Sequence, residues 1–150
     1  MSFLCCRTKS IQQVTYEETE EFVLPIHEGK VIKVYDGDTI TIAFHLYGKL
    51  YRKSVRLYGI DTPEIKAENE NEKSKAKKAR DALVSKVLYK VVTLKNLNNE
   101  KYGRLLAEVW IDNETVSDWM VKQGHAVLYN GKTKNKQQWS MPESVSYNTD

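Results

Sequence analysis

Residues 31–64 constrain the fold most, because their apolar residues follow the spacing of β-strands. Apolar and smaller or polar residues alternate along residues 40–46, which predicts a half-buried strand. A short apolar run at residues 31–34 predicts a strand before it, and Asp36-Gly37 is a turn signal between the two. A third strand is predicted around Arg56, whose side chain faces away from its two apolar neighbours.

The next segments predict a long helix, two more strands and a short helix. Residues 70–89 are rich in Ala, Lys and Glu, and their apolar residues recur every three or four positions. Strands are predicted at residues 91–97 and 105–111, with a loop of turn-forming residues between them. Thr115 begins a capping-box pattern, which predicts a short helix that ends at Gly124.

The order of these elements predicts the architecture. Three strands, a helix, two strands and a helix favour an α+β domain with an antiparallel sheet. Five short strands with a helix between the third and the fourth have the connectivity of an OB barrel. The sequence therefore predicts a five-stranded OB-fold-like β-barrel, with a long amphipathic helix between strands three and four and a short helix after strand five.

The chain has 150 residues, which is enough for one domain with a substantial core. Residues 1–27 lack periodicity and hold a cluster of glutamates, so they predict a flexible N-terminal arm. We expect the folded domain at residues 28–140 and a loose tail at residues 141–150. The formal net charge of +3 does not oppose a polyanionic partner, and it does not establish one either.

The only cysteines are the neighbours Cys5 and Cys6, which cannot clamp a loop by a disulfide. With Arg7 and Lys9 nearby, they fit either a palmitoylation site, which would be a weak membrane tether, or two inert thiols. The start of the chain is too short and too soon charged for a secretory signal. We therefore expect an intracellular, cytoplasmic protein that is membrane-associated only when acylated.

Carboxylates gather on two turns that follow predicted strands. Asp36 and Asp38 flank a glycine, and Asp61 begins the sequence Asp-Thr-Pro-Glu. Hard divalent cations take such oxygen ligands, and two carboxylates with one carbonyl leave coordination positions for water and substrate. The same residues also fit a plain hairpin turn at Asp36 and a helix start at Asp61.

Two arginines and a glutamate add features of a phosphate site. Arg56 and Arg104 each offer a planar fork of donors that suits phosphate oxygens. Arg56 has the alternative role of covering the sheet surface. Glu64 follows Asp61 closely enough to act as a general base on a water beside a metal ion.

Four segments, in order, resemble the staphylococcal nuclease (thermonuclease) family: VIKVYDGDTITI, VRLYGIDTPE, NEKYGRLLAEVW and MVKQG. The resemblance runs from about Lys30 to Tyr129. Its most specific part is R-L-x-G-I-D-T-P-E followed later by K-Y-G-R. The resemblance implies a calcium-dependent endonuclease that hydrolyses DNA and RNA with little base specificity.

The resemblance also implies a role for each matching residue. Asp38, Asp61 and the backbone carbonyl of Thr62 would hold Ca²⁺, with Asp36 bordering the site. The implied catalytic residues are Arg56, Glu64 and Arg104, and the implied substrate-binding residues are Lys101, Tyr102 and Tyr129. Residues 68–72 are acidic where a basic loop is common in the family, which would weaken the approach of DNA.

The main alternative is a non-catalytic nucleic-acid-binding module of the same fold. Degenerate copies of the domain usually lack several of the implied catalytic and metal-binding residues, and this chain has all of them. We therefore favour the enzyme. We expect a monomer without an obligate protein partner, which prefers DNA and RNA that are single-stranded or locally unpaired.

Overall fold

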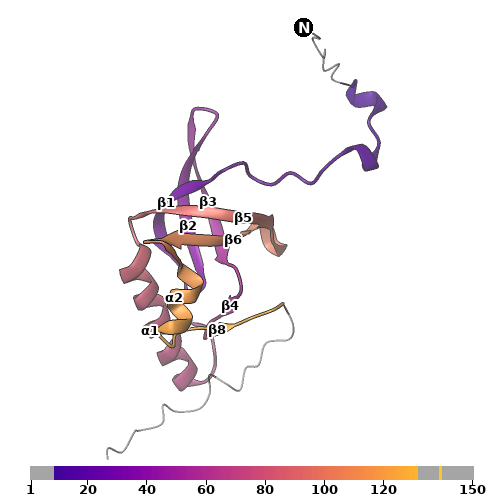
Figure 1. Cartoon of the computed structure of the whole chain (residues 1–150). Coiled ribbons are helices and arrows are strands. Elements are labelled where there is room, and N and C mark those ends of the chain that lie inside the picture. Colours follow the sequence, from indigo (N-terminus) through magenta and orange to yellow (C-terminus); the bar gives the residue numbers. More distant parts are fainter. Residues whose placement is uncertain (1–8, 132–138, 140–150) are drawn as a thin grey trace, which may run out of the picture.

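The computed structural model describes residues 9–131 and residue 139. At its centre is a closed barrel (Figure 1), whose strands are β1 (Glu28–Val34), β2 (Thr39–Leu46), β3 (Lys49–Leu57), β5 (Val91–Asn99) and β6 (Leu105–Ile111). Neighbouring strands pair in the order β3-β2-β1-β5-β6, and a further pairing of β3 with β6 closes the ring. The predicted five-stranded OB-fold-like barrel is confirmed.

The closing strand pair departs from the predicted antiparallel sheet. The other pairs of the barrel are antiparallel, whereas β3 and β6 run parallel, with Val55 opposite Leu105 and Leu57 opposite Ala107. The relative direction of the closing strands follows from the path of the chain around the whole barrel. No local residue pattern records that path, so the sequence could not indicate it.

Three two-residue strands extend this framework. β4 (Ile60–Asp61) pairs antiparallel with β8 (Val127–Leu128), and β7 (Glu114–Thr115) adds to the edge of β6. In the β4–β8 pair, Asp61 lies opposite Val127. Strand β8 therefore holds the start of the second acidic turn in place.

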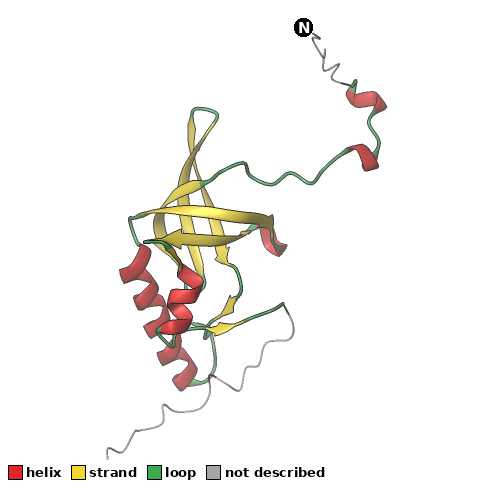
Figure 2. Cartoon of the chain, viewed as in Figure 1, coloured by secondary structure: helices red, strands yellow, loops and turns green. Residues whose placement is uncertain are grey.

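The two helices lie at one end of the barrel, away from the tip of the β2–β3 hairpin (Figure 2). α1 (Glu70–Val87) begins at a cap formed by Asn69, whose side chain accepts hydrogen bonds from the backbone amides of Asn71 and Glu72. The alternative helix start at Asp61 is therefore wrong, because no helix begins before Glu70 in the described part of the loop.

α2 (Val116–Lys122) starts as its capping pattern predicts. The Thr115 hydroxyl accepts a hydrogen bond of 3.0 Å from the backbone amide of Asp118. Between the helices and the barrel lies a single hydrophobic core, to which α1 contributes Ala79, Leu83 and Val87 and α2 contributes Val116 and Met120. The apolar stripe predicted for the long helix is its buried face.

The N-terminal segment has two short 3-10 turns, Ile11–Gln13 and Tyr16–Glu18, that lie away from the barrel in Figure 1. Leu24 and Ile26 pack against the core. The Asn99 side chain donates hydrogen bonds to Glu21 Oε1 and to the carbonyl of Phe22. Contacts with the barrel thus begin a few residues before the predicted boundary at residue 28.

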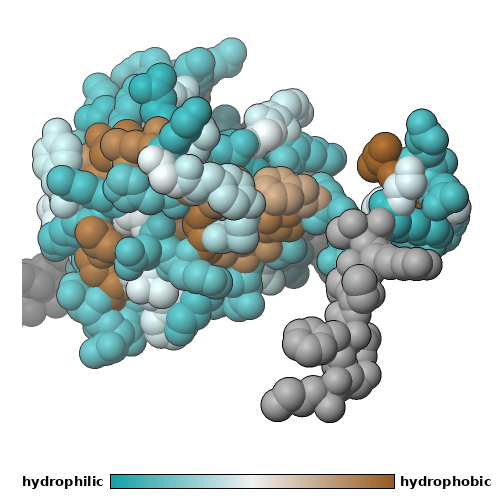
Figure 3. All heavy atoms as spheres, turned by 90° about the horizontal axis from the view of Figure 1, so that it is seen from above, coloured by the Kyte–Doolittle hydropathy of each residue, from teal (hydrophilic) through white to brown (hydrophobic). Residues whose placement is uncertain are grey.

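The face of the molecule seen from above is mainly hydrophilic, with separate apolar areas (Figure 3). No helix within the described residues has the length and apolar character needed to cross a membrane. Cys5 and Cys6 lie outside the described residues, as does the predicted tail at residues 141–150.

Candidate active site

The first acidic turn is held against the second by a close approach at Gly37. A Cβ atom added to Gly37 would lie 3.0 Å from the Cβ atoms of both Thr62 and Ala79, so a larger residue would push the turn away. The carbonyl of Asp38 also accepts a hydrogen bond of 2.8 Å from the backbone amide of Leu57. The Asp-Gly-Asp-Thr turn is therefore packed against β3, Thr62 and α1 rather than standing free as a hairpin turn.

Arg56 lies between the two acidic turns and is only 9% exposed. Its Nη1 atom is 2.5 Å from Asp38 Oδ2, and its Nη2 atom is 3.7 Å from Asp61 Oδ1. Nη2 also donates a hydrogen bond of 3.1 Å to the carbonyl of Ile60. Both carboxylates are buried as well, and the guanidinium is the opposite charge that offsets the cost of removing them from water.

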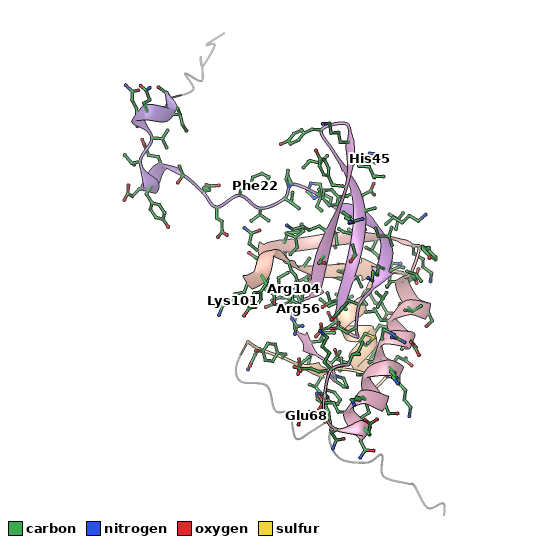
Figure 4. The ribbon with its side chains drawn as sticks, turned by 180° about the vertical axis from the view of Figure 1, so that it is seen from behind. Phe22, His45, Arg56, Glu68, Lys101 and Arg104 are labelled. Atoms are coloured by element: carbon green, nitrogen blue, oxygen red, sulfur yellow. The ribbon has the colours of Figure 1, made fainter. Side chains whose placement is uncertain are left out.

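Glu100 joins Arg56 to the second arginine. Arg104 donates to both carboxylate oxygens of Glu100, at 2.7 Å from Nε and 3.1 Å from Nη2. Glu100 Oε1 also lies 3.8 Å from Arg56 Nε. Figure 4 shows Arg56 and Arg104 close together, with Lys101 beside them and Glu68 well away from the pair. The two predicted catalytic arginines are thus brought to one place from β3 and from the β5–β6 loop.

The backbone of the β5–β6 loop explains this geometry. Tyr102 and Gly103 both have positive φ angles, of 67° and 75°, which turn the chain sharply between Glu100 and Arg104. The Glu100 amide donates a hydrogen bond of 2.9 Å to the Arg104 carbonyl across the turn. The two oppositely charged side chains consequently leave the loop next to each other.

The buried charges shift two pKa values. Burial alone would lower the pKa of Arg56, but attraction to Asp38, together with Glu100 and Asp61, outweighs it and raises the pKa. Burial and the neighbouring Asp38 carboxylate raise the pKa of Asp36 to about 6. One Asp36 oxygen accepts a hydrogen bond of 3.1 Å from the Asp38 amide. Arg56 therefore stays charged at any ordinary pH, whereas Asp36 changes charge under mildly acidic conditions.

These side chains border a pocket of about 230 Å³. The predicted site residues among its lining are Asp36, Asp38, Arg56, Thr62, Glu64 and Arg104. Glu64 is exposed, and its backbone amide donates a hydrogen bond of 3.2 Å to Glu72 Oε1. Asp61 is not among the lining residues; it is buried, with its Oδ1 atom close to Arg56. The structure thus gathers both acidic turns, both arginines and the glutamate in one place.

The three residues predicted to contact the nucleotide lie outside the lining of this pocket. Tyr102 is 95% exposed and borders a neighbouring groove on the barrel, and Lys101 is exposed on the same loop. Tyr129 is half-buried, with its backbone amide 2.8 Å from the carbonyl of Gly59. None of the three is among the residues that line the pocket.

Sequence reasoning missed Glu100 and Thr39. The Thr39 hydroxyl donates to Asp38 Oδ1 at 2.9 Å and lies 3.5 Å from Arg104 Nη1, so it links a carboxylate to an arginine. A usable signal existed for Glu100, because it and Arg104 flank a tight loop and such residues face each other across a hairpin. Thr39 carried no signal beyond its place in a strand.

The donor set fits a hard divalent cation. Asp38 and Asp61 are carboxylates whose oxygens lie within 4 Å of the same guanidinium, and Thr62 is buried beside them. Within the described residues, no group of three or more His, Cys, Asp or Glu side chains forms a site that could hold a metal ion. Two carboxylates and a backbone carbonyl are hard oxygen donors of the kind that such cations take, and they would leave coordination positions for water.

The sequence is similar to those of known nucleases. The family model described as "Staphylococcal nuclease homologue" matches residues 54–146. A thermonuclease from Staphylococcus hyicus is 36% identical over 99 residues, which cover 65% of this chain and 56% of that protein. Endonuclease YncB from Bacillus subtilis is 30% identical over 154 residues, which cover 91% of this chain and 71% of that protein.

An uncharacterized endonuclease from Escherichia coli is 35% identical over 104 residues, which cover 67% of this chain and 60% of that protein. The chain therefore spans less than two thirds of the length of the thermonuclease and of this endonuclease. The matched region contains the end of β3 with Arg56, the second acidic turn and the β5–β6 loop, and it begins after the first acidic turn.

Proposed function

This chain belongs to the staphylococcal nuclease homologue family, and we propose that it is a calcium-dependent nuclease that hydrolyses phosphodiester bonds of DNA and RNA. One observation carries the proposal. Arg56 and Arg104 converge through Glu100 at a pocket that Glu64 also lines, with the carboxylates of Asp38 and Asp61 buried around Arg56.

Asp38, Asp61 and the backbone carbonyl of Thr62 are the residues that would hold calcium. When bound, the ion supplies charge neutralisation and polarisation of the phosphodiester. Burial in the barrel holds these donors in a fixed arrangement, with Arg56 as the charge partner of both carboxylates.

The two arginines would bind the non-bridging phosphate oxygens. A guanidinium is a planar fork that can donate two parallel hydrogen bonds to a phosphate. Negative charge grows on those oxygens as the five-coordinate transition state forms, so donors already held in place stabilise that state most. Glu100 would keep the Arg104 guanidinium oriented before substrate arrives.

Glu64 would accept a proton from the attacking water, or orient that water. It is exposed at the pocket, which leaves its carboxylate access to solvent and to substrate. All of these contacts involve phosphate or water, so we propose little selection among bases.

Cleavage assays with defined metals test the proposal. Labelled single-stranded DNA and RNA are incubated with the protein in calcium, in magnesium or in chelator. We expect cleavage of both substrates in calcium and none in chelator. Cleavage that persists in chelator would refute the metal assignment, and binding without cleavage in calcium would favour the non-catalytic module.

We propose that the protein is a monomer, which sedimentation of the purified protein tests directly.

We also propose a cytoplasmic protein that reaches membranes only through acylation of Cys5 or Cys6. Hydroxylamine cleaves thioesters, so treatment should release any membrane-bound fraction. A bound fraction that survives this treatment would contradict the tether.

A further inference from the structure

A second groove, of about 670 Å³, opens on the barrel surface next to the candidate active site. It is lined by residues of β1, β2 and β3 and of the β5–β6 loop. Arg104 borders both the groove and the active-site pocket. The two hollows therefore meet at a residue that we assign to phosphate binding.

The lining of the groove is basic. Its charged residues are Lys33, Arg52, Lys53 and Arg104, and no carboxylate lies among the residues that border it. Arg104 is paired with Glu100, but Lys33, Arg52 and Lys53 take part in no ion pair within the described residues. Lys33 and Arg52 are also exposed, so their charge is directed at solvent.

The strand register shows how the groove continues from the active site. Lys33 lies opposite Thr41 and Thr41 opposite Ser54, so one row of side chains crosses β1, β2 and β3. Because alternate residues of a strand share a face, Arg52, Ser54 and Arg56 project from the same side of β3. Arg52 is four residues from Arg56, a distance of about 13 Å along the strand.

The floor of this groove suits a chain of phosphates. Thr41 and Ser54 are small and carry hydroxyl groups, so they leave room for a backbone and can donate hydrogen bonds to it. Tyr102 stands at the edge with 95% of its surface exposed, which leaves an aromatic face for a base to stack on. Cations beside an exposed aromatic ring are typical of surfaces that hold single strands.

We propose that this groove, which we call the β1–β3 groove, binds the sugar-phosphate backbone of a single nucleic-acid strand to one side of the phosphate that is cleaved. The proposal rests on the proposed nuclease function, because Arg104 would contact the nucleic-acid strand at the point where that strand passes from the groove into the active-site pocket. A single nucleic-acid strand fits better than a duplex, since the groove holds one row of side chains on one face of the barrel and can reach only one backbone.

Binding in chelator tests the groove without any need for cleavage. Fluorescence anisotropy is measured with a labelled oligothymidylate of about 12 nucleotides, a length within the range that such barrels cover. The test variant Lys33→Gln/Arg52→Gln removes two exposed charges. The control Lys77→Gln/Lys90→Gln removes two exposed charges outside the groove.

We expect the groove variant to bind the oligonucleotide at least tenfold more weakly at ~0.1 M salt, and the control to change affinity by less than twofold. The slope of log affinity against log salt should fall by roughly 1.4, because each lost phosphate contact removes about 0.7 for a single strand. The variant Lys33→Arg/Arg52→Lys keeps both charges and should retain most of the affinity.

Equal losses in the groove variant and the control would overturn the proposal, and so would an unchanged salt slope. Anionic vesicles of phosphatidylserine and phosphatidylcholine form a second arm, because a lipid headgroup offers the same phosphate chemistry. Vesicle binding that is lost in the groove variant while oligonucleotide binding stays intact would also overturn it. Strand binding without any cleavage would refute the nuclease function and leave the groove standing.

Discussion

The active-site pocket and the β1–β3 groove both carry arginine, but they hold it in opposite ways. Arg56 in the pocket is buried and touches three carboxylates, whereas Arg52 in the groove is exposed and touches none within the described residues. Buried paired charges are fixed in position, whereas exposed charges without a partner are free to attract a polyanion from solution. The same residue type, four positions apart on one strand, therefore suits chemistry in one place and attraction in the other.

Substitution of Arg56 should produce the largest difference between the two regions. Arg56→Gln leaves Asp38 and Asp61 buried without their partner, so we expect a loss of about 3–5 kcal/mol in the free energy of unfolding. Turnover should also fall by ~10²–10³-fold, since a charge-stabilising donor is lost. Urea denaturation and a cleavage assay measure both effects.

Arg52→Gln is the matched control for this change. Arg52 is exposed on the same face of the same strand, so its removal should alter the free energy of unfolding by less than about 0.5 kcal/mol. Equal destabilisation by the two substitutions would contradict the contrast between a buried and an exposed arginine.

Glu64 separates catalysis from stability inside the pocket. Glu64→Gln removes a general base, and we expect turnover to fall by ~10²–10⁴-fold. The side chain is exposed, so the urea midpoint should move little. A variant that keeps its turnover would show that another group activates the water.

Glu100 tests whether the two arginines act as a unit. Glu100→Gln weakens the carboxylate contacts that orient Arg104 and lie near Arg56, and we expect kcat/KM to fall by about 10- to 100-fold. Since Glu100 acts through Arg104, the loss from Glu100→Gln combined with Arg104→Lys should be smaller than the sum of the single losses. Additive losses would mean that Glu100 does not position Arg104.

Asp36 should give the smallest effect, as a pH dependence of stability. Its pKa in the folded protein is about 6, against an ordinary value of 3.8, so folding favours the protonated form. The stability that comes from this group is present below pH 3.8 and is lost as the pH rises through 6.

Asp36→Asn keeps the oxygen that accepts from the Asp38 amide and removes the charge. In chelator, the variant should gain stability over the parent between pH 4 and pH 6, on the order of 1 kcal/mol because Asp36 is only partly buried. Parallel curves of unfolding free energy against pH for variant and parent would contradict the raised pKa.

The barrel and its long helix could be predicted because their signals are periodic. Alternation in β2 and the Ala79, Leu83, Val87 stripe of α1 are each set by one buried face, and the structure buries those faces. The parallel closure of β3 with β6 and the two-residue pair of β4 with β8 have no period to detect. They depend on how distant segments meet once the barrel forms.

The candidate site could be predicted for the residues that lie in segments resembling the family, and not for their partners. Arg56 and Arg104 could be matched to family segments, whereas the contacts of Glu100 with both arginines exist only after the barrel closes. The position of Tyr102 at the groove rather than the pocket depends on the positive φ angle of its backbone, which residue type does not reveal.

The most direct test of the division between pocket and groove is a single-turnover cleavage assay in calcium, with increasing enzyme and labelled single-stranded DNA. We predict that Arg56→Gln lowers the limiting rate by at least ~10²-fold. Arg52→Gln should mainly raise the enzyme concentration needed for half of that rate. A fall in the limiting rate that is as large for Arg52→Gln as for Arg56→Gln would contradict the account.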